Sequence, residues 1–405
     1  MTIERIVVIN DISDAKGGAT ALALLSAFQF RQRGHAVTFI TGDGGANPAL
    51  HEAGVEVVGL GQDRLFGRGR LSAFASGLYN RKAKRMVRDW IMANDTPGTV
   101  YHLHGWAQIL SPSVFGALAP VRDRVLLSAH DFFLACPNGS FSFLKTGEVC
   151  ELTPLSGACI AADCDRRSYG QKLWRVARQA LERYLCAKHD HPPILMIHAG
   201  MRKFFERTGI PSTALHTVPN PITPFSTRRI AAETNAGALF VGRLEGTKGP
   251  DLACAACRAA GVPLTVIGDG VMADALRADY PEVTFTGRLK PADIAAYAAT
   301  ARMLLMPSRY PEPYGLVAIE AAWSGLPVIV ADTALLAPDI VAAGAGASVE
   351  PRNTAAFAEA VGRLARDDGA TAAASLAAHV GTRDLGMTDD AWTDLLLGHY
   401  AARLA

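Results

Sequence analysis

Short apolar runs recur along the whole chain, and many are followed by longer segments in which apolar residues return every three or four positions. Clear runs lie at residues 6–9, 36–40, 264–267 and 328–330. Such runs are typical of parallel strands buried on both faces, and the longer segments are typical of helices that cover them. The pattern therefore predicts an α/β fold.

The most informative stretch reads as strand, loop, helix and strand. An apolar run at 303–306 is followed by a proline-rich turn, and from Gly315 onward the apolar residues Leu316, Ile319 and Trp323 repeat at helical spacing. A glycine and a proline then end the predicted helix, before the apolar run at 328–330.

Two glutamates mark the start of this helix. Glu312 lies just before it and Glu320 lies within it, with seven residues between them. The unpaired N–H groups of a helix N-terminus carry roughly half a positive charge and bind anions. The arrangement predicts a phosphate site beside two carboxylates that can bind hydroxyl groups, which suits a nucleotide-sugar.

The segment Glu312-Pro-Tyr-Gly-Leu-Val-Ala-Ile-Glu320 resembles the Glu-x7-Glu signature of the retaining glycosyltransferases of family 4. The resemblance covers nearly the whole chain and implies the GT-B fold, with two Rossmann-like domains whose parallel sheets face each other across a cleft. A chain of 405 residues is long enough for two α/β domains of about 200 residues each. We place an acceptor-side domain at residues 1–222, a nucleotide-sugar-binding domain at 223–388, and a C-terminal helix at 389–405 that crosses back to the first domain.

The second domain carries the residues that the resemblance assigns to the donor. Arg243 and Lys248 follow an apolar strand and precede an alanine-rich helix, so two cations beside a helix N-terminus can hold a diphosphate. The family has an Arg and a Lys with this role, and the resemblance makes Glu312 a ligand of the sugar hydroxyls and Glu320 a ligand of the ribose. The remaining donor contacts it implies are the helix start and the loop that flanks the base, at Gly315, Leu316, Val317 and Arg288.

The chain departs from the family after residues 328–330. Family members commonly have a Gly-x-x-Glu pattern there, whereas this chain has residues 334–339, which end in Asp339. Asp339 is the acid that can replace the family's glutamate, so the contacts of this loop stay open.

The first domain carries a second set of candidates. Gly17 and Gly18 follow the first strand, where glycines let the backbone approach a ligand. The resemblance implies that they touch the donor diphosphate and sugar, and a plain strand-to-helix turn is the alternative. His130 ends the apolar run at 125–129 and resembles the histidine that contacts the donor sugar beside the acceptor; a packed loop histidine is the alternative. His102 and His104 would share a strand face, but a metal pair lacks a third ligand nearby.

Four of the seven cysteines fall within 29 residues, at Cys136, Cys150, Cys159 and Cys164. Disulfides are not expected in a reducing compartment, and the spacing lacks the Cys-x2-Cys pairs of zinc knuckles. A structural zinc site and free cysteines in an ordered loop therefore both remain open. Asp163 and Asp165 mimic an Asp-x-Asp metal motif that has no role in a GT-B enzyme.

The net charge of the chain is +2, but the two halves of the chain differ in charge. Residues 1–225 carry 25 lysines and arginines against 18 acids, and the remainder carries 15 against 20. Residues 63–88 and 166–185 mix basic with apolar side chains, a pattern able to lie in an anionic membrane interface, although a solvated helix face explains it equally. Without an apolar run of about 18 residues or a signal peptide, we expect a cytoplasmic protein, peripheral on the inner face of the membrane. A nucleic-acid partner is not expected, since no reading motif accompanies the basic stretches.

The sequence thus predicts a metal-independent hexosyltransferase that needs no cofactor. It would move a sugar from a nucleoside diphosphate sugar to a hydroxyl acceptor, with retention of configuration, and the acceptor would be a lipid-linked or envelope polysaccharide intermediate. Glu312, His130, Arg243 and Lys248 are the expected catalytic residues. A non-catalytic sugar-nucleotide-binding subunit would carry the same binding residues. A Rossmann oxidoreductase would need a Gly-x-Gly-x-x-Gly turn, which the first loop lacks.

Overall fold

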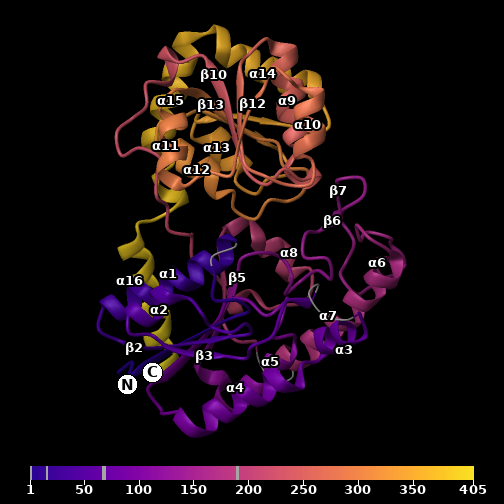
Figure 1. Ribbon diagram of the computed structural model, residues 1–405, viewed down its shortest axis with the longest axis vertical. Coiled ribbons are helices and arrows are strands. Elements are labelled where there is room, and N and C mark those ends of the chain that lie inside the picture. Colours follow the sequence, from indigo (N-terminus) through magenta and orange to yellow (C-terminus); the bar gives the residue numbers. More distant parts are fainter. Residues whose placement is uncertain (1, 15–16, 66–69, 188–190) are drawn as a thin grey trace. The chain divides into compact units, whose positions relative to one another are not determined.

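The computed structural model describes residues 2–14, 17–65, 70–187 and 191–405 (Figure 1). The chain divides into two compact units, each built on its own parallel sheet. The first unit comprises Met1–Gly139, Leu152–Val218 and Asp389–Ala405, and the second comprises Ser140–Glu151 and Pro219–Thr388. The predicted α/β fold is confirmed.

The first unit has a seven-stranded parallel sheet in the order β3-β2-β1-β4-β5-β8-β9. Its central strands are short and almost wholly buried, as their apolar sequences predict, whereas the edge strands β3 and β9 are partly exposed. They are β1 (Arg5–Asn10), β2 (Ala36–Thr41), β3 (Glu56–Gly59), β4 (Thr99–Leu103), β5 (Val125–Ala129), β8 (Ile194–Met196) and β9 (Leu215–Thr217). The helices of this unit are α1 (Gly18–Gln32), α2 (Pro48–Glu52), α3 (Arg70–Leu78), α4 (Arg81–Asn94), α5 (Ser113–Leu118), α6 (Gly157–Ala161), α7 (Tyr169–Ala187), α8 (Arg202–Glu206) and α16 (Asp389–Leu404).

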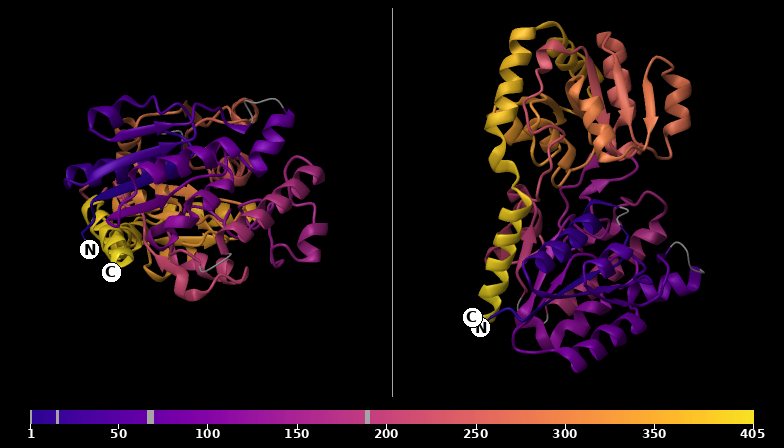
Figure 2. Two further views of the ribbon diagram at one scale, coloured as in Figure 1. Left: turned by 90° about the horizontal axis from the view of Figure 1, so that it is seen from below. Right: turned by 60° about the vertical axis from the view of Figure 1, so that its left-hand side comes forward.

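The C-terminal helix α16 packs on the first unit, as expected (Figure 2). The rings of Phe30 in α1 and Tyr400 in α16 meet edge to face with their centroids 5.3 Å apart. At the surface, Arg33 at the end of α1 binds the carboxylates of Asp390 and Asp394 at 2.8 and 2.5 Å. An aromatic contact and a charge pair therefore hold the last helix against the first one.

The second unit has a six-stranded parallel sheet in the order β12-β11-β10-β13-β14-β15. The strands are β10 (Gly237–Val241), β11 (Leu264–Ile267), β12 (Thr284–Gly287), β13 (Ala301–Met306), β14 (Val328–Ala331) and β15 (Gly346–Val349). The helices are α9 (Pro250–Ala260), α10 (Ala273–Asp279), α11 (Pro291–Ala299), α12 (Leu316–Trp323), α13 (Ala337–Ala342), α14 (Thr354–Arg366) and α15 (Asp368–Gly381).

Helices cover both faces of this second sheet, so alternate residues of one strand enter different cores. In β13, Leu304 packs with the buried alanines of α12, whereas Met303 and Leu305 pack with α9 and α14. A strand buried on both faces needs an apolar residue at every position, which is why residues 303–306 are uniformly apolar.

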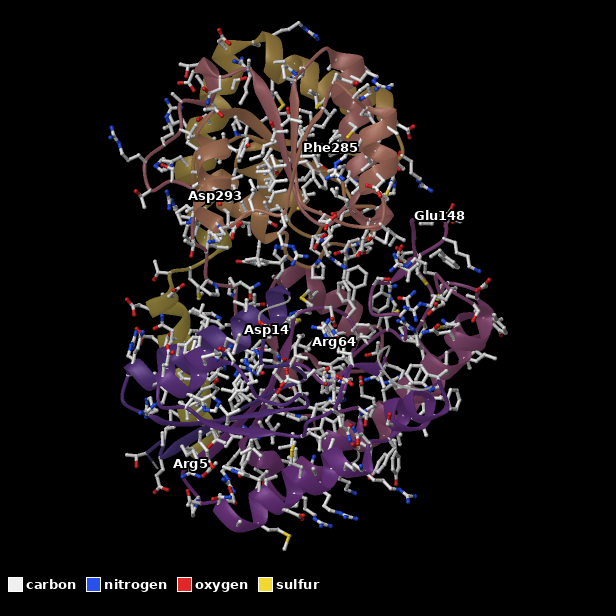
Figure 3. All side chains as sticks on the ribbon, viewed as in Figure 1. Arg5, Asp14, Arg64, Glu148, Phe285 and Asp293 are labelled. Carbon is white, nitrogen blue, oxygen red and sulfur yellow. The ribbon has the colours of Figure 1, made fainter. Side chains whose placement is uncertain are left out.

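The division into units differs from the predicted domain boundaries at two places. Residues 140–151, which contain the hairpin β6 (Ser142–Phe143) and β7 (Glu148–Val149), belong to the second unit. Glu148, labelled in Figure 3, binds Arg352 there at 3.4 Å. The second unit also begins at Pro219 instead of 223, because Tyr314 donates a hydrogen bond to the Asn220 carbonyl at 3.1 Å.

Within the described residues, no helix combines the length and the apolar character needed to cross a bilayer.

Candidate functional site

The donor-side candidates lie at the topological switch point of the second sheet. β10 and β13 are neighbours, and the chain continues from β10 toward one edge and from β13 toward the other. Ligands of open α/β sheets bind at the carboxyl ends of strands at such a point. Arg243 and Lys248 follow β10, while Glu312 and Gly315 follow β13, so the fold brings these two sequence motifs to the same edge of the sheet.

Lys248 and Glu312 form an ion pair at this edge of the sheet. Lys248 Nζ lies 2.5 Å from Glu312 Oε2 and donates a hydrogen bond to the Tyr310 hydroxyl at 3.1 Å. Ser308 donates a hydrogen bond to the same Oε2 atom at 2.9 Å. Burial would raise the pKa of Glu312, but the Lys248 charge and the hydrogen bonds from Lys248, Tyr310 and Ser308 outweigh it and lower the pKa below its ordinary value. Glu312 is therefore an ionised carboxylate in a small polar network.

The start of α12 follows Glu312 at the same edge of the sheet. Gly315 has a φ of 76°, and a Cβ atom there would lie 2.6 Å from Leu336 Cδ2. The fold thus requires glycine at this position. The first hydrogen bond within the helix runs from Ala318 N–H to the Gly315 carbonyl, so the N–H groups of Leu316 and Val317 precede it and are available to an anion.

The other predicted donor residues lie in different surroundings. The Arg243 side chain is 63% exposed and binds Glu245 at 2.9 Å. Arg288 follows β12 and is exposed. Glu320 is half-buried in α12, and burial raises its pKa to about 7. In the described structure no hydrogen bond or ion pair joins Arg243, Arg288 or Glu320 to the Lys248–Glu312 pair.

Sequence reasoning missed the residues that hold the Lys248 loop in place. Arg309 makes two hydrogen bonds to the Asp251 carboxylate, at 2.8 and 2.7 Å, and donates another to the Gly246 carbonyl at 2.9 Å. Its backbone N–H also donates to the Thr247 carbonyl at 2.9 Å. Ser308, Arg309 and Tyr310 lie between β13 and Glu312 in the sequence. Their position between the strand and the candidate glutamate was the one feature that could have identified them.

Residues 334–339, where the chain departs from the family's sequence pattern, support the site structurally. The Leu335 N–H donates to the Glu312 carbonyl at 3.1 Å, and Leu336 packs against Gly315. Asp339 lies in the first turn of α13. The loop therefore holds the backbone of Glu312 in place. This structural role does not depend on whether Asp339 replaces the glutamate that family members have in this loop.

The first unit contains a cavity of about 1000 Å³ at its own switch point, between β1 and β4. Its walls come from the carboxyl ends of β1, β4 and β5 and from α3 and α7, and Arg64, labelled in Figure 3, is among them. Its lining includes the buried polar residues Asp11, His104 and Arg178 and the exposed Phe74. The cavity therefore offers both polar groups and apolar surface to a ligand.

His130 lines this cavity, as its position after β5 predicts, and it is joined to His104. His130 Nε2 and His104 Nδ1 lie 3.1 Å apart, and the two rings are stacked. Burial lowers the pKa of His130 to about 4 and that of His104 well below its ordinary value. The buried His130 Nδ1 and His104 Nε2 atoms have no hydrogen-bond partner among the described residues.

His102 has a structural role. It is fully buried, its Nδ1 lies 2.6 Å from the Tyr400 hydroxyl and its Nε2 lies 2.8 Å from Ser128 Oγ. Both ring nitrogens are therefore occupied by protein groups, and one of them ties α16 to the first sheet.

Two further cavity residues were missed because their partners are distant in sequence. Asp11 accepts hydrogen bonds from the backbone N–H groups of residues 108–110, at 2.6 to 2.8 Å, and so holds the loop after β4. Arg178 in α7 is buried, and in the described structure its guanidinium makes one long hydrogen bond, to the Trp106 carbonyl at 3.4 Å. Nothing in either residue's immediate sequence marks it.

Gly17 and Gly18 lie at the start of α1, but the fold does not require the first of them. Gly17 has a φ of −177°, which any residue adopts, and a Cβ atom built there meets no atom of the described residues within 4 Å beyond its chain neighbours. The preceding residues 15–16 lie outside the described residues. Gly17 and Gly18 lie where the loop after β1 enters α1, as a strand-to-helix turn requires. The free space beside Gly17 also allows a ligand to approach its backbone.

The cysteine cluster surrounds a lysine. All seven cysteines are buried thiols, and the buried Lys172 ammonium lies 3.1 Å from Cys164 Sγ and 3.6 Å from Cys159 Sγ. Across the described residues, no group of three or more His, Cys, Asp or Glu side chains is arranged to hold a metal ion. Asp165 of the Asp-x-Asp pattern binds Arg175 at 2.9 Å.

The two basic stretches behave differently. In α4 the apolar residues Val87, Trp90 and Ile91 are buried, whereas Met92 and most of the basic residues are exposed. Residues 66–69 of the first stretch lie outside the described residues. Around α3 and α7, by contrast, Phe74, Tyr169 and Leu173 remain exposed.

Comparisons with known proteins agree with this architecture. A model described as a glycosyl transferase 4-like domain matches residues 17–221, and one described as glycosyl transferases group 1 matches residues 236–367. The glycogen synthase of Mycobacterium tuberculosis (strain ATCC 25618 / H37Rv) is 34% identical over 269 residues, which cover 61% of each protein. The chain thus spans about three fifths of that relative's length.

Two solved structures show the same fold. Sucrose-phosphate synthase from Thermosynechococcus elongatus superposes with a TM-score of 0.71 at 17% identity, covering 99% of each chain. Anabaena Alr3699/HepE in complex with UDP superposes with a TM-score of 0.69 at 15% identity, covering 98% of this chain and 100% of that one. The chain therefore belongs to the group 1 glycosyl transferases with a 4-like N-terminal domain, and it has the GT-B fold.

Proposed function

We propose that this protein is a retaining glycosyltransferase that moves a sugar from a nucleoside diphosphate sugar to a hydroxyl acceptor. The observation that carries the proposal is the Lys248–Glu312 pair at the switch point of the second sheet, beside the available N–H groups of Leu316 and Val317. A cation and a helix start fit a diphosphate, and a carboxylate fits sugar hydroxyls.

The chemistry follows from where charge develops. When the bond between sugar and diphosphate breaks, negative charge builds on the β-phosphate. Arg243, Lys248 and the start of α12 stabilise that charge from fixed positions, which is the most effective way to lower such a barrier. Because these groups supply the positive charge, we propose that the transfer needs no metal ion, and activity should persist in excess EDTA.

Glu312 and Glu320 have separate roles in this proposal. Glu312 is ionised and can accept hydrogen bonds from the sugar hydroxyls once the donor phosphate shares Lys248. Glu320 accepts hydrogen bonds from the two ribose hydroxyls. Arg288, after β12, flanks the base.

Retention of configuration rests on the family resemblance. No carboxylate is assigned as a covalent nucleophile, so we propose displacement on one face of the sugar through an oxocarbenium-like state. Proton NMR of the first product formed should show the anomeric configuration of the donor.

The cavity of the first unit is the proposed acceptor site. Its lining combines buried polar groups with the aromatic residues Phe74 and Trp174. His130 lines it and is proposed to orient the acceptor hydroxyl and the sugar. Alr3699/HepE has been solved with UDP and with UDP-glucose, which supports a nucleotide-sugar donor in a chain of this fold.

We further propose that the acceptor is a lipid-linked saccharide of envelope polysaccharide assembly, reached from the cytoplasmic side of the membrane. Phe74, Tyr169 and Leu173 are exposed beside the exposed Arg166 and Arg167. Exposed apolar and basic side chains together bind anionic membranes, with roughly 1 kcal/mol from each basic residue near the surface. Flotation with vesicles that contain anionic lipid at low salt tests this part, and absence of binding would contradict it.

Thermal stability against UDP, GDP, ADP, TDP and NAD, without added metal, tests the donor site. One nucleoside diphosphate should stabilise the protein by about 2.7 kcal/mol at a hundred times its Kd. Stabilisation by NAD alone would overturn the transferase proposal. Tight diphosphate binding without release of nucleotide from any sugar nucleotide would instead indicate a non-catalytic binding subunit.

A further inference from the structure

The histidine pair in the first unit has an incomplete set of hydrogen bonds. His104 Nδ1 and His130 Nε2 share one bond of 3.1 Å, and the outer nitrogen of each ring is buried without a partner among the described residues. Both residues line the cavity. A buried polar atom without a partner costs free energy, so this pair is built to be completed by a ligand or by water.

The number of protons on the two rings determines which hydrogen bonds the pair can make with a ligand. Burial lowers both pKa values, so the two imidazoles are neutral near pH 7 and each carries one N–H. One of these protons must lie between His104 Nδ1 and His130 Nε2. The second then lies either on His130 Nδ1 or on His104 Nε2. The pair therefore presents one donor and one acceptor, and the direction of the inner hydrogen bond decides which histidine holds which.

The position of His104 is fixed by its own backbone. Its N–H donates to the Ile9 carbonyl at 2.9 Å, and a Cβ atom at the next residue, Gly105, would lie 2.5 Å from Asn10 Oδ1. The neighbouring His102 cannot take the same part, because Tyr400 and Ser128 occupy both of its ring nitrogens. His104 is thus the group that can hold the orientation of His130, and the shared hydrogen bond couples the proton positions of the two rings.

From these observations we infer that His104 is a positioning residue that selects the tautomer of His130 and so determines how His130 meets a hydroxyl group in the cavity. The inference rests on the proposed function for its catalytic consequence. Its structural part, the fixed tautomer, does not depend on that function. A hydroxyl group is both a donor and an acceptor, so it can complete the pair in the form that His104 selects.

Nitrogen-15 NMR of the histidine rings tests the structural part without any substrate. The full-length protein, its H104N variant and its H104F variant are compared, with signals assigned through H130Q. In wild type and in H104N, whose amide can replace the Nδ1 contact, His130 should populate a single tautomer. In H104F it should populate a mixture or the other tautomer. Unchanged His130 nitrogen shifts in H104F would overturn the inference.

Kinetics tests the catalytic part. The rate of nucleotide release from UDP-glucose, GDP-mannose and ADP-glucose is measured, with water as the acceptor. H104F should lower kcat by about tenfold to a hundredfold, the scale for losing a group that orients a histidine through its second nitrogen, with the nucleotide Kd unchanged. H104N should recover most of the loss. Equal activity of H104F and wild type, or equal damage in H104N and H104F, would contradict the inference.

Controls separate this inference from folding and from the proposed function. His216 lies in the same unit, is half-buried and does not line the cavity, so H216N should leave both the His130 spectrum and kcat unchanged. If H104F does not fold, H104A removes the same contact with a smaller side chain. If wild type releases nucleotide from none of the donors, the proposed function fails, and the NMR result still decides the role of His104.

Discussion

Lys248 Nζ lies 2.5 Å from Glu312 Oε2 although the two residues are 64 positions apart in the sequence. The proposal gives them different ligands, since Lys248 is to bind the donor phosphate and Glu312 the donor sugar. Their contact keeps a buried carboxylate ionised and holds a cation where a diphosphate is expected. Donor binding is then an exchange, in which the phosphate takes hydrogen bonds of Lys248 while sugar hydroxyls donate to Glu312.

Lys248→Met should weaken nucleoside diphosphate binding and also destabilise the second unit. Removing one partner of a mostly buried ion pair leaves the other charge uncompensated, which costs on the order of 3 kcal/mol. We expect a lower unfolding midpoint in urea and a Kd for the diphosphate raised at least tenfold. Isothermal calorimetry measures the second effect.

A double-mutant cycle provides the control for that prediction. K248M together with E312Q should regain most of the lost stability, because the remaining side chain is neutral, but it should not regain diphosphate affinity. E312Q alone should keep the affinity for the free diphosphate and lose the preference for the sugar nucleotide. Restored diphosphate binding in the double variant would show that Lys248 acts only through Glu312.

Arg243→Ala should reduce catalysis without reducing stability. The Arg243 side chain is 63% exposed and its described ion pair is with Glu245, so its loss removes little from the folded state. If it stabilises the departing diphosphate, kcat should fall by about 10² to 10³, the scale for losing one preorganised donor. A fall of less than about threefold would remove Arg243 from the mechanism. Arg277→Ala, at another exposed arginine of the same unit, is the matched control.

Two glycine substitutions should have opposite signatures. Gly17→Ala meets no atom within 4 Å and needs no unusual φ, so its thermal midpoint should equal that of wild type. A fall in kcat/KM in that variant would indicate that a ligand binds near the Gly17 backbone. Unchanged kinetics would indicate that Gly17 is only part of a strand-to-helix turn. Gly315→Ala places a Cβ atom 2.6 Å from Leu336 at a φ of 76°, so it should lose on the order of 1–3 kcal/mol of stability whatever the ligand.

The sequence predicted the parts of the site that a single local segment carries. Residues 303–330 contain a strand, a left-handed glycine and a helix start, and each is encoded by its own neighbours. Because β10 and β13 are central strands of one parallel sheet, the motifs that follow them had to meet at its carboxyl edge. That inference needed the fold class and no further detail.

The parts that escaped prediction depend on pairing between distant segments. The contact of His104 with His130 requires that β4 and β5 be neighbours in register, and the hold of Asp11 on residues 108–110 spans almost a hundred positions. Lys172 reads as one basic residue of an amphipathic helix, and only the structure shows its ammonium buried against the sulfurs of Cys159 and Cys164. No local pattern distinguishes such residues from ordinary polar ones.

Glu320 should make the stability of the second unit depend on pH. Its pKa is raised by burial to about 7, against an ordinary value of 4.5, so between these pH values the folded state holds a proton that the unfolded state has lost. The stability from this group is complete below pH 4.5, declines as pH rises toward 7, and is then constant. Glu320→Gln removes the decline. At pH 8 the variant should be more stable than wild type by on the order of 1–3 kcal/mol, and at pH 4.5 the two should be equal.

Urea unfolding of both proteins at pH 4.5 and pH 8 measures this difference, and Glu359→Gln on the exposed face of α14 is the matched control. A variant that gains equally at both pH values would show that the carboxyl group does not titrate in this range. If Glu320 binds the ribose, the same variant should bind the nucleoside diphosphate more weakly while being more stable at pH 8. A carboxylate that only packs would show the gain in stability at pH 8 without the loss of affinity, so the affinity decides between the two roles.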